Sequence, residues 1–180
     1  MRYKEFIIEG RNAVLEAFRA GKTIDKLFVL DGCQDGPVKS ILREAKKTDT
    51  IINFVDKERL DRLANSGHHQ GVVAQAAAYE YAEVEDILNA AKEKGEAPFI
   101  FILDEIEDPH NLGAIIRTAN LCGAHGVIIP KRRAVGLTAT VAKTSAGAVN
   151  YTPVAKVTNI AKTIEELKKE GMWFVCADMD

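Results

Sequence analysis

The sequence predicts an α/β fold in two units, and three observations support this prediction. Short apolar runs alternate with segments whose apolar residues recur at helical spacing. Residues 99–103 are apolar throughout, as in a parallel strand covered on both faces. Residues 78–97 carry six acidic and two basic groups and separate two such alternations. We therefore expect a small α/β domain over residues 1–77, an acidic linker with one short helix over 78–97, and a parallel-sheet α/β domain over 98–180.

The first unit alternates helices and strands. Pro37 suits the first turn of a helix, and Asp56 suits an N-cap, because its side chain can accept a hydrogen bond from a free backbone N–H. In chain order we expect a helix over residues 14–18 that ends at Gly21, a strand at 26–30, a helix over 37–45, a strand at 51–55, a helix after Asp56 and a strand at 71–74.

The second unit begins with a β-α-β pattern. Leu112, Ile115 and Ile116 fall at helical spacing, Gly123 ends that helix, and Asn111 just before it can serve as its N-cap. The full expectation is a helix over 84–91 in the linker, a strand at 99–103, a helix over 112–119, a strand at 126–129, a helix over 138–148, a strand near Val154, a helix over 160–167 capped by Thr158 or Asn159, and a strand at 172–177.

Composition excludes several classes of protein. The 180 residues are 47% hydrophobic and 28% charged with a net charge of −2, and no apolar run is long enough for a membrane helix. Three widely separated cysteines indicate reduced thiols and a cytoplasmic protein. His68 and His69 lack carboxylate or cysteine neighbours, so we expect no metal site. No Gly-x-Gly-x-x-Gly follows a strand, which argues against a dinucleotide enzyme.

Arg117 is the strongest candidate for chemistry. It shares a helix face with Gly113, Ala114, Asn120 and Leu121, and a cation among mostly small residues suggests that something approaches closely. A guanidinium is a rigid fork that suits phosphate. The plain alternative is a solvated arginine.

Other basic residues are candidate RNA contacts. Lys131, Arg132 and Arg133 follow a strand at the sheet edge expected to hold the Asn111 loop. Lys143 lies in a small, polar segment, and Arg11 and Asn12 stand at a helix start, where they would read backbone phosphates. A solvated turn or helix end explains each of them nearly as well.

Several segments resemble one family. Residues 108–119, DPHNLGAIIRTA, are similar to the first signature of the SpoU/TrmH family of RNA ribose 2′-O-methyltransferases, within the SPOUT superfamily. Residues 123–127, 130–133, 143–148, 10–17 and 69–74 also match that family. The combination resembles the subgroup that acts on large-subunit ribosomal RNA, which has a ribosomal-protein-like RNA-binding domain before the catalytic one.

The resemblance implies a homodimeric enzyme that uses S-adenosylmethionine to methylate a ribose hydroxyl of ribosomal RNA. It implies catalytic roles for Arg117 and Asn111 and places Ala177 and Asp178 near the methyl donor. The family's later signatures, which form its knot and most of the donor pocket, find no match here. We therefore expect an incomplete SPOUT domain, truncated at the C-terminus, and an inactive chain.

Two other functions remain open. One is an RNA-binding module without catalysis, and the other is an enzyme for a small phosphate-bearing substrate held at the Asn111 helix start. The effect of Arg117→Ala on methylation and on RNA affinity separates the first from the enzyme, and indifference to RNA would favour the second.

Overall fold

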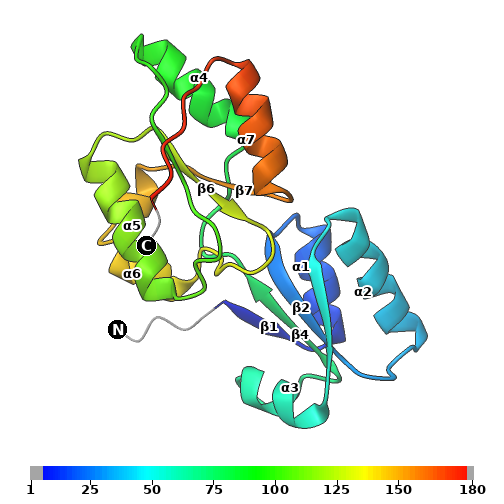
Figure 1. Ribbon diagram of the computed structural model, residues 1–180. Helices are drawn as coiled ribbons and strands as arrows, with labels where there is room; N and C mark the ends of the chain where they lie inside the picture. Colours follow the sequence, from blue (N-terminus) through cyan, green and yellow to red (C-terminus); the bar gives the residue numbers. More distant parts are fainter. Residues whose placement is uncertain (1–5, 178–180) are drawn as a thin grey trace. The chain divides into compact units, whose positions relative to one another are not determined.

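The computed structural model describes residues 6–177, and the chain forms two compact units (Figure 1). One unit holds the chain up to Glu80 together with Gly136–Lys143. The other holds Tyr81–Val135 and the chain from Thr144 onward.

The first unit is built on a mixed four-stranded sheet. Its strands are β1 (Ile7–Glu9), β2 (Ile24–Leu30), β3 (Ile51–Val55) and β4 (Val72–Ala76), in the order β1-β4-β2-β3. β4 runs antiparallel to β1 and β2, whereas β2 and β3 are parallel. The α/β class of this unit agrees with the sequence, but β1 was not foreseen, since three residues give too short a pattern.

Three helices cover the two faces of that sheet. α1 (Arg11–Arg19) and α2 (Gly36–Lys47) pack on one face, and α3 (Lys57–Leu63) packs on the other. The Asp56 side chain accepts a hydrogen bond from the Arg59 N–H at 2.7 Å, so the predicted cap of α3 is confirmed. The core of the α1–α2 face is formed by Val14, Phe18, Leu27, Val29, Val38, Ile41, Val72 and Ala74.

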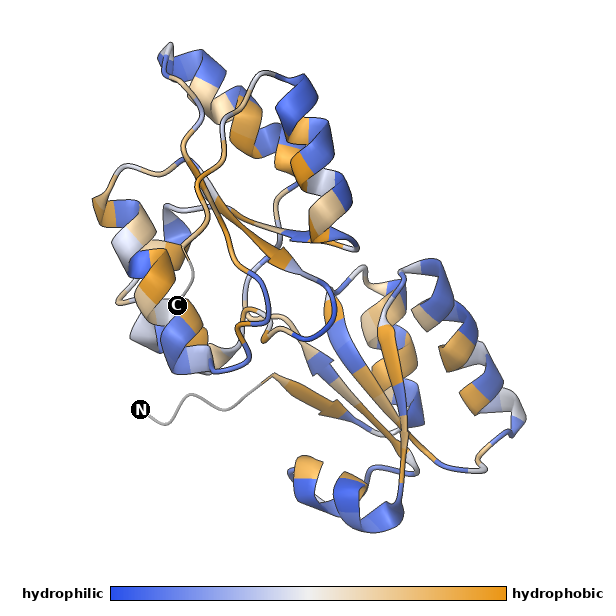
Figure 2. Ribbon diagram, in the orientation of Figure 1, coloured by the Kyte–Doolittle hydropathy of each residue, from blue (hydrophilic) through white to orange (hydrophobic). Residues whose placement is uncertain are grey.

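The second unit has an all-parallel sheet with the order β5-β6-β7. These strands are β5 (Ile100–Ile102), β6 (Gly126–Pro130) and β7 (Val154–Val157). Every residue of β6 is buried, as expected for a central parallel strand, and Figure 2 shows this strand as apolar.

Helices lie on both sides of this sheet (Figure 1). α4 (Val84–Lys94) and α7 (Ile160–Lys169) cover one face, where Ile87 and Leu167 pack with Ile128 of β6. α5 (Pro109–Leu121) contacts β6 as well and lies on the other side in the figure. Asn159 caps α7 by accepting the Lys162 N–H at 2.9 Å, which decides between the two predicted caps, Thr158 and Asn159. α4 thus packs within the second unit, although the sequence placed it in a linker.

The helix predicted over 138–148 is wrong in its extent. The structure has α6 (Ala139–Thr144) and then a separate 3₁₀ turn, η1 (Ala148–Asn150). Between them Ala146 has φ 50° and Gly147 has φ 89°, both in the left-handed region. A helix cannot continue through two such residues, because its backbone needs negative φ at each position.

The strand predicted over 172–177 is also wrong. These residues form no strand, although their side chains alternate in exposure: Met172 and Phe174 pack against the core of α4 and α7, while Trp173 and Val175 are 96% and 98% exposed. An apolar alternation becomes a strand only where a neighbour accepts its ladder hydrogen bonds. Within residues 6–177, no helix is long and apolar enough to cross a membrane.

Candidate functional site

The first candidate site is built on α5, which follows β5 through a charged loop. Asp108 caps the helix by accepting the His110 N–H at 2.8 Å, and Pro109 is its first residue. The predicted cap, Asn111, is instead an exposed residue of the first turn. Asp108 is the N-cap because Pro109 follows it: proline suits the first position of a helix, where its missing N–H costs no hydrogen bond.

Gly113 allows a second segment to approach α5 closely. A Cβ atom at this position would lie 2.8 Å from Thr144 Cβ and 3.0 Å from the Ser145 backbone nitrogen. The Thr144 hydroxyl also donates a hydrogen bond to the Pro109 carbonyl at 3.3 Å. The absence of a side chain at Gly113 therefore lets the segment of Thr144 and Ser145 pack directly on the first turns of α5.

Arg117 lies one turn beyond Gly113 on the same face of α5. Its side chain is exposed and makes no hydrogen bond or ion pair with the residues that the structure describes. It is the ninth residue of the helix, so its Cα lies about 12 Å along the axis from Pro109. Asn111 is therefore nearer the sheet edge, and Arg117 offers an unengaged guanidinium along the helix.

The basic loop after β6 lies at the carboxyl edge of the parallel sheet, beside the loop after β5. The Val135 N–H donates to the Ile106 carbonyl at 2.9 Å, and Arg133 forms a 2.7 Å ion pair with Glu105. Lys131 is half-buried, and its backbone N–H donates to the Val157 carbonyl. Arg132 is exposed and unpaired within residues 6–177. The two loops do meet at one edge, and Arg132 is the cation of this loop left open to a ligand.

The remaining predicted contacts lie elsewhere. Lys143 is exposed on α6 and belongs to the first unit. Ala177 is exposed in the irregular segment after α7, and Asp178 lies outside the described residues. In the part of the chain that the structure describes, no group of three or more His, Cys, Asp and Glu is placed to hold a metal ion.

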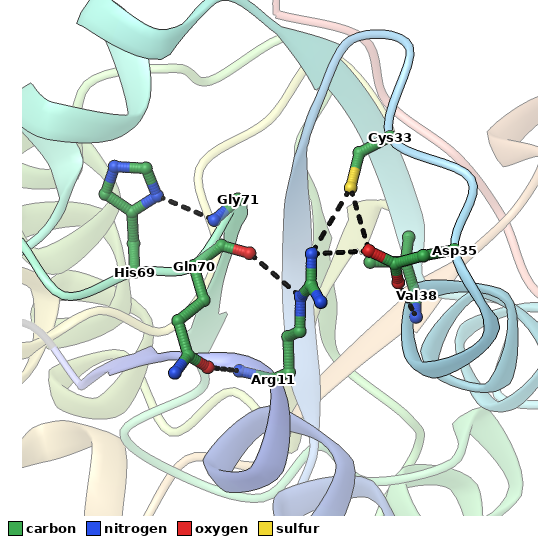
Figure 3. A network of polar contacts seen from close by, with 7 residues as sticks. All are labelled: Arg11, Cys33, Asp35, Val38, His69, Gln70 and Gly71. Atoms are coloured by element: carbon green, nitrogen blue, oxygen red, sulfur yellow. Dashed lines mark hydrogen bonds and ion pairs between the residues drawn. The ribbon is translucent and has the colours of Figure 1, made fainter.

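Arg11 is the centre of a second candidate site, in the first unit (Figure 3). Its Nε donates to the Gln70 carbonyl at 3.1 Å, and its Nη2 lies 2.5 Å from Asp35 Oδ2 and 3.6 Å from Cys33 Sγ. The Gln70 side-chain oxygen in turn accepts the Arg11 backbone N–H at 3.1 Å. Arg11 is thus tied to three neighbours, while the adjacent Asn12 is exposed.

Sequence reasoning missed the partners of Arg11. Gln70 is 59 residues away and Asp35 is 24 residues away, and neither belongs to an apolar periodicity. The sequence shows no carboxylate next to His69, yet the fold supplies one. The His69 ring is buried, its Nδ1 accepts the Gly71 N–H at 2.9 Å, and its Nε2 lies 2.9 Å from Asp61. The run His69-Gln70-Gly71 directly before β4 was the sequence feature that could have pointed to this turn.

Comparison with known proteins gives the family. Residues 7–82 match the family model described as RNA 2′-O ribose methyltransferase substrate binding, and residues 98–180 match the SpoU rRNA methylase family. A Bacillus subtilis protein assigned by name to the TrmH family of tRNA/rRNA methyltransferases is 53% identical over 169 residues, covering 94% of this chain and 68% of that protein.

The chain belongs to the SpoU/TrmH family of RNA methyltransferases. A family member from Staphylococcus haemolyticus is 48% identical over 177 residues, covering 98% of this chain and 71% of the relative. The SpoU/TrmH matches leave residues 83–97 between the two family models, within the predicted linker.

Solved structures of SpoU/TrmH-type proteins are more distant. An S-adenosylmethionine-bound rRNA methyltransferase from Sinorhizobium meliloti has a TM-score of 0.43 and 23% identity, covering 91% of this chain and 58% of that one. The SpoU methyltransferase AviRb from Streptomyces viridochromogenes, in complex with the same cofactor, has a TM-score of 0.44 and 20% identity, covering 93% and 59%. At these values the solved structures add nothing to the family assignment.

Proposed function

We propose that the protein takes part in S-adenosylmethionine-dependent methylation of a ribose 2′-hydroxyl in ribosomal RNA of the large subunit. The first unit would bind the RNA, and α5 of the second unit would face the reacting ribose. The observation that carries the proposal is the exposed guanidinium of Arg117, which has no partner among residues 6–177 and lies on the helix that matches the methylase family. The proposal includes the homodimer and the cytoplasmic location expected of such an enzyme.

The chemistry explains why an unengaged arginine is useful. A ribose hydroxyl is a weak acid, so its attack on a methyl group requires negative charge to develop on the oxygen. A fixed cation aimed at that oxygen or at the neighbouring phosphate stabilises the charge as it forms. Arginine stays protonated, so Arg117 would act by position and charge and not as a base. Asn111 would orient the ribose, and Arg132 would hold a phosphate.

The methyl donor is the second substrate of the proposed reaction. When bound, S-adenosylmethionine supplies the methyl group. Among residues 6–177 the predicted donor contact is Ala177, whose methyl side chain is exposed and cannot hydrogen-bond an adenosine or a carboxylate. The side chain of Ala177 therefore cannot hold the donor, and the proposal takes its support from the RNA side of the reaction.

The test is a methyl-transfer assay on ribosomal RNA with radiolabelled S-adenosylmethionine. Because the chain spans 68% of the Bacillus subtilis relative, residues 1–180 would be assayed joined to the remaining third of that relative. Arg117→Ala should lower the rate by at least about a hundredfold with RNA affinity nearly unchanged. Lys162→Ala on the exposed side of α7 serves as the control and should change neither.

The other outcomes separate the competing functions. Full activity of the Arg117→Ala variant would remove the arginine from the mechanism. RNA binding without methylation by the unsubstituted fusion would favour the RNA-binding module. A product methylated on a base, identified by nuclease digestion and mass spectrometry, would overturn ribose specificity.

A further inference from the structure

A surface pocket opens at the start of α1 in the first unit. Its volume is about 490 Å³, within the range of small-molecule sites. Residues from α1, β2, the β2–α2 loop, the start of α2 and the turn before β4 form its wall. Those used below are Arg11, Asn12, Leu30, Pro37 and Gln70.

The pocket holds an arginine whose charge is already neutralised. Asp35 Oδ2 lies 2.5 Å from Arg11 Nη2, and Asp35 Oδ1 is fixed by the Val38 N–H at the start of α2. A phosphate that approached Arg11 Nη2 would find that nitrogen already paired with a carboxylate. The arrangement therefore favours an uncharged ligand that can use the remaining N–H groups of Arg11 on Nη1, which make no contact within residues 6–177.

Neutral polar groups and apolar surfaces meet around that guanidinium. Asn12 is exposed and its amide makes no hydrogen bond with the described residues, so it keeps both a donor and an acceptor. The Gln70 oxygen accepts the Arg11 N–H, and the Gln70 amide N–H groups make no hydrogen bond with residues 6–177. Leu30 and Pro37 supply the apolar lining. A flat heterocycle with donors and acceptors at its edge suits this combination.

The turn that carries Gln70 is held in a strained form. Gln70 has φ 51° and Gly71 has φ 83°, so a non-glycine residue stands in the left-handed region. The buried ring of His69 fixes this turn through the Gly71 N–H. Strain of this kind persists only where the surroundings enforce it, and it gathers at ligand sites. The pocket wall is thus preorganised before any ligand arrives.

We infer that this pocket binds one unpaired nucleobase of the RNA, read by Asn12 and the free edge of Arg11. The inference rests on the proposed function, because it takes RNA as the substrate. It replaces the expectation that Arg11 and Asn12 contact backbone phosphates. Unstacked bases are the usual targets of sequence-specific RNA recognition, since their edges are open to side chains.

The test measures binding of the 180-residue chain to two labelled RNAs by fluorescence anisotropy. One is a stem–loop with unpaired bases, and the other is a fully paired duplex of equal length. Asn12→Ala should weaken binding to the stem–loop about tenfold and leave the duplex unchanged. The salt dependence of binding should keep its slope, because no phosphate contact is lost. Abasic loop nucleotides should abolish the effect of the substitution.

A substitution at a second exposed asparagine serves as the control. Asn89→Ala, at an exposed asparagine of α4, should change neither affinity, and matching thermal melts would show that Asn12→Ala is folded. An equal loss on both RNAs with the salt slope lowered by about one would identify a phosphate contact and overturn the inference. No loss on either RNA would overturn it too. Failure of the unsubstituted chain to bind either RNA would overturn both this inference and the proposed function.

Discussion

Gly113 makes close packing on α5 possible. A Cβ atom there would press on Thr144 and on the backbone of Ser145, which cannot swing aside as a long side chain could. We expect Gly113→Ala to lower the free energy of unfolding by about 1–3 kcal/mol, measured by urea titration. Gly36→Ala is the matched control, since Gly36 begins α2 with open space around it and should be neutral or slightly stabilising. Equal urea midpoints for the two variants would contradict the prediction.

Two adjacent histidines provide a second test at the residue scale. His69 is buried and uses both ring nitrogens, whereas His68 is exposed. Because the Gly71 N–H can only donate, His69 Nδ1 accepts and Nε2 carries the proton that faces Asp61. His69→Gln cannot keep both bonds and should lower the free energy of unfolding by about 1–3 kcal/mol.

The neighbouring variant controls for this substitution. His68→Gln should stay within about 0.5 kcal/mol, as surface changes usually do. Thermal unfolding of both variants, followed by circular dichroism, is the measurement. A larger loss for His68→Gln than for His69→Gln would show that the turn before β4 is not held as described.

At the scale of elements, the structure distinguishes between two candidate N-caps for α5. Asp108 accepts the His110 N–H, while Asn111 is an exposed residue inside the first turn. Asp108→Ala should therefore lower the free energy of unfolding by about 1 kcal/mol, and Asp108→Asn should recover most of it, because asparagine is an equally good cap.

Asn111→Ala gives the opposite expectation for stability. It removes no cap and places a better helix former in the helix, so the free energy of unfolding should not fall. Methylation by the full-length fusion should nevertheless drop if Asn111 orients the ribose. Helical ellipticity and urea unfolding check the first part, and a stability loss for Asn111→Ala like that of Asp108→Ala would reverse the assignment.

At the scale of the whole molecule, the chain does not divide into two continuous halves. Gly136–Lys143 belong to the first unit, where the Ala78 N–H donates to the Leu137 carbonyl at 2.7 Å and Leu137 is 1% exposed. Leu137→Ala should lower the free energy of unfolding by about 2–5 kcal/mol. Hydrogen exchange should then speed up in β4 and not in β6.

The control for that prediction is Leu121→Ala, at a leucine that is 80% exposed on α5, which should leave stability and exchange nearly unchanged. Faster exchange confined to β6 and α5 after Leu137→Ala would show that this segment supports the second unit instead. The result bears on the domain limits, since residues 1–77 alone lack Leu137, a buried residue that belongs to the first unit.

The sequence alone determined the α/β class, the order of most helices and strands, and the cap Asp56, and it narrowed the cap of α7 to Thr158 or Asn159. These depend on apolar periodicity and on residues three or four positions apart, which any chain shows before it folds. It also pointed to the family through residues 108–119, and the comparisons support that assignment. The position of Arg117 on α5 followed from spacing in the same way.

Tertiary structure decided the rest. The helix predicted over 138–148 is interrupted, and residues 172–177 have no strand partner within residues 6–177. Asp35 and Gln70, far away in sequence, contact Arg11. These outcomes depend on which distant segments pack together, and a ladder bond or an ion pair needs a partner that local sequence does not name. Local spacing sets what each segment can become, whereas packing across the fold sets which hydrogen bonds are available to it.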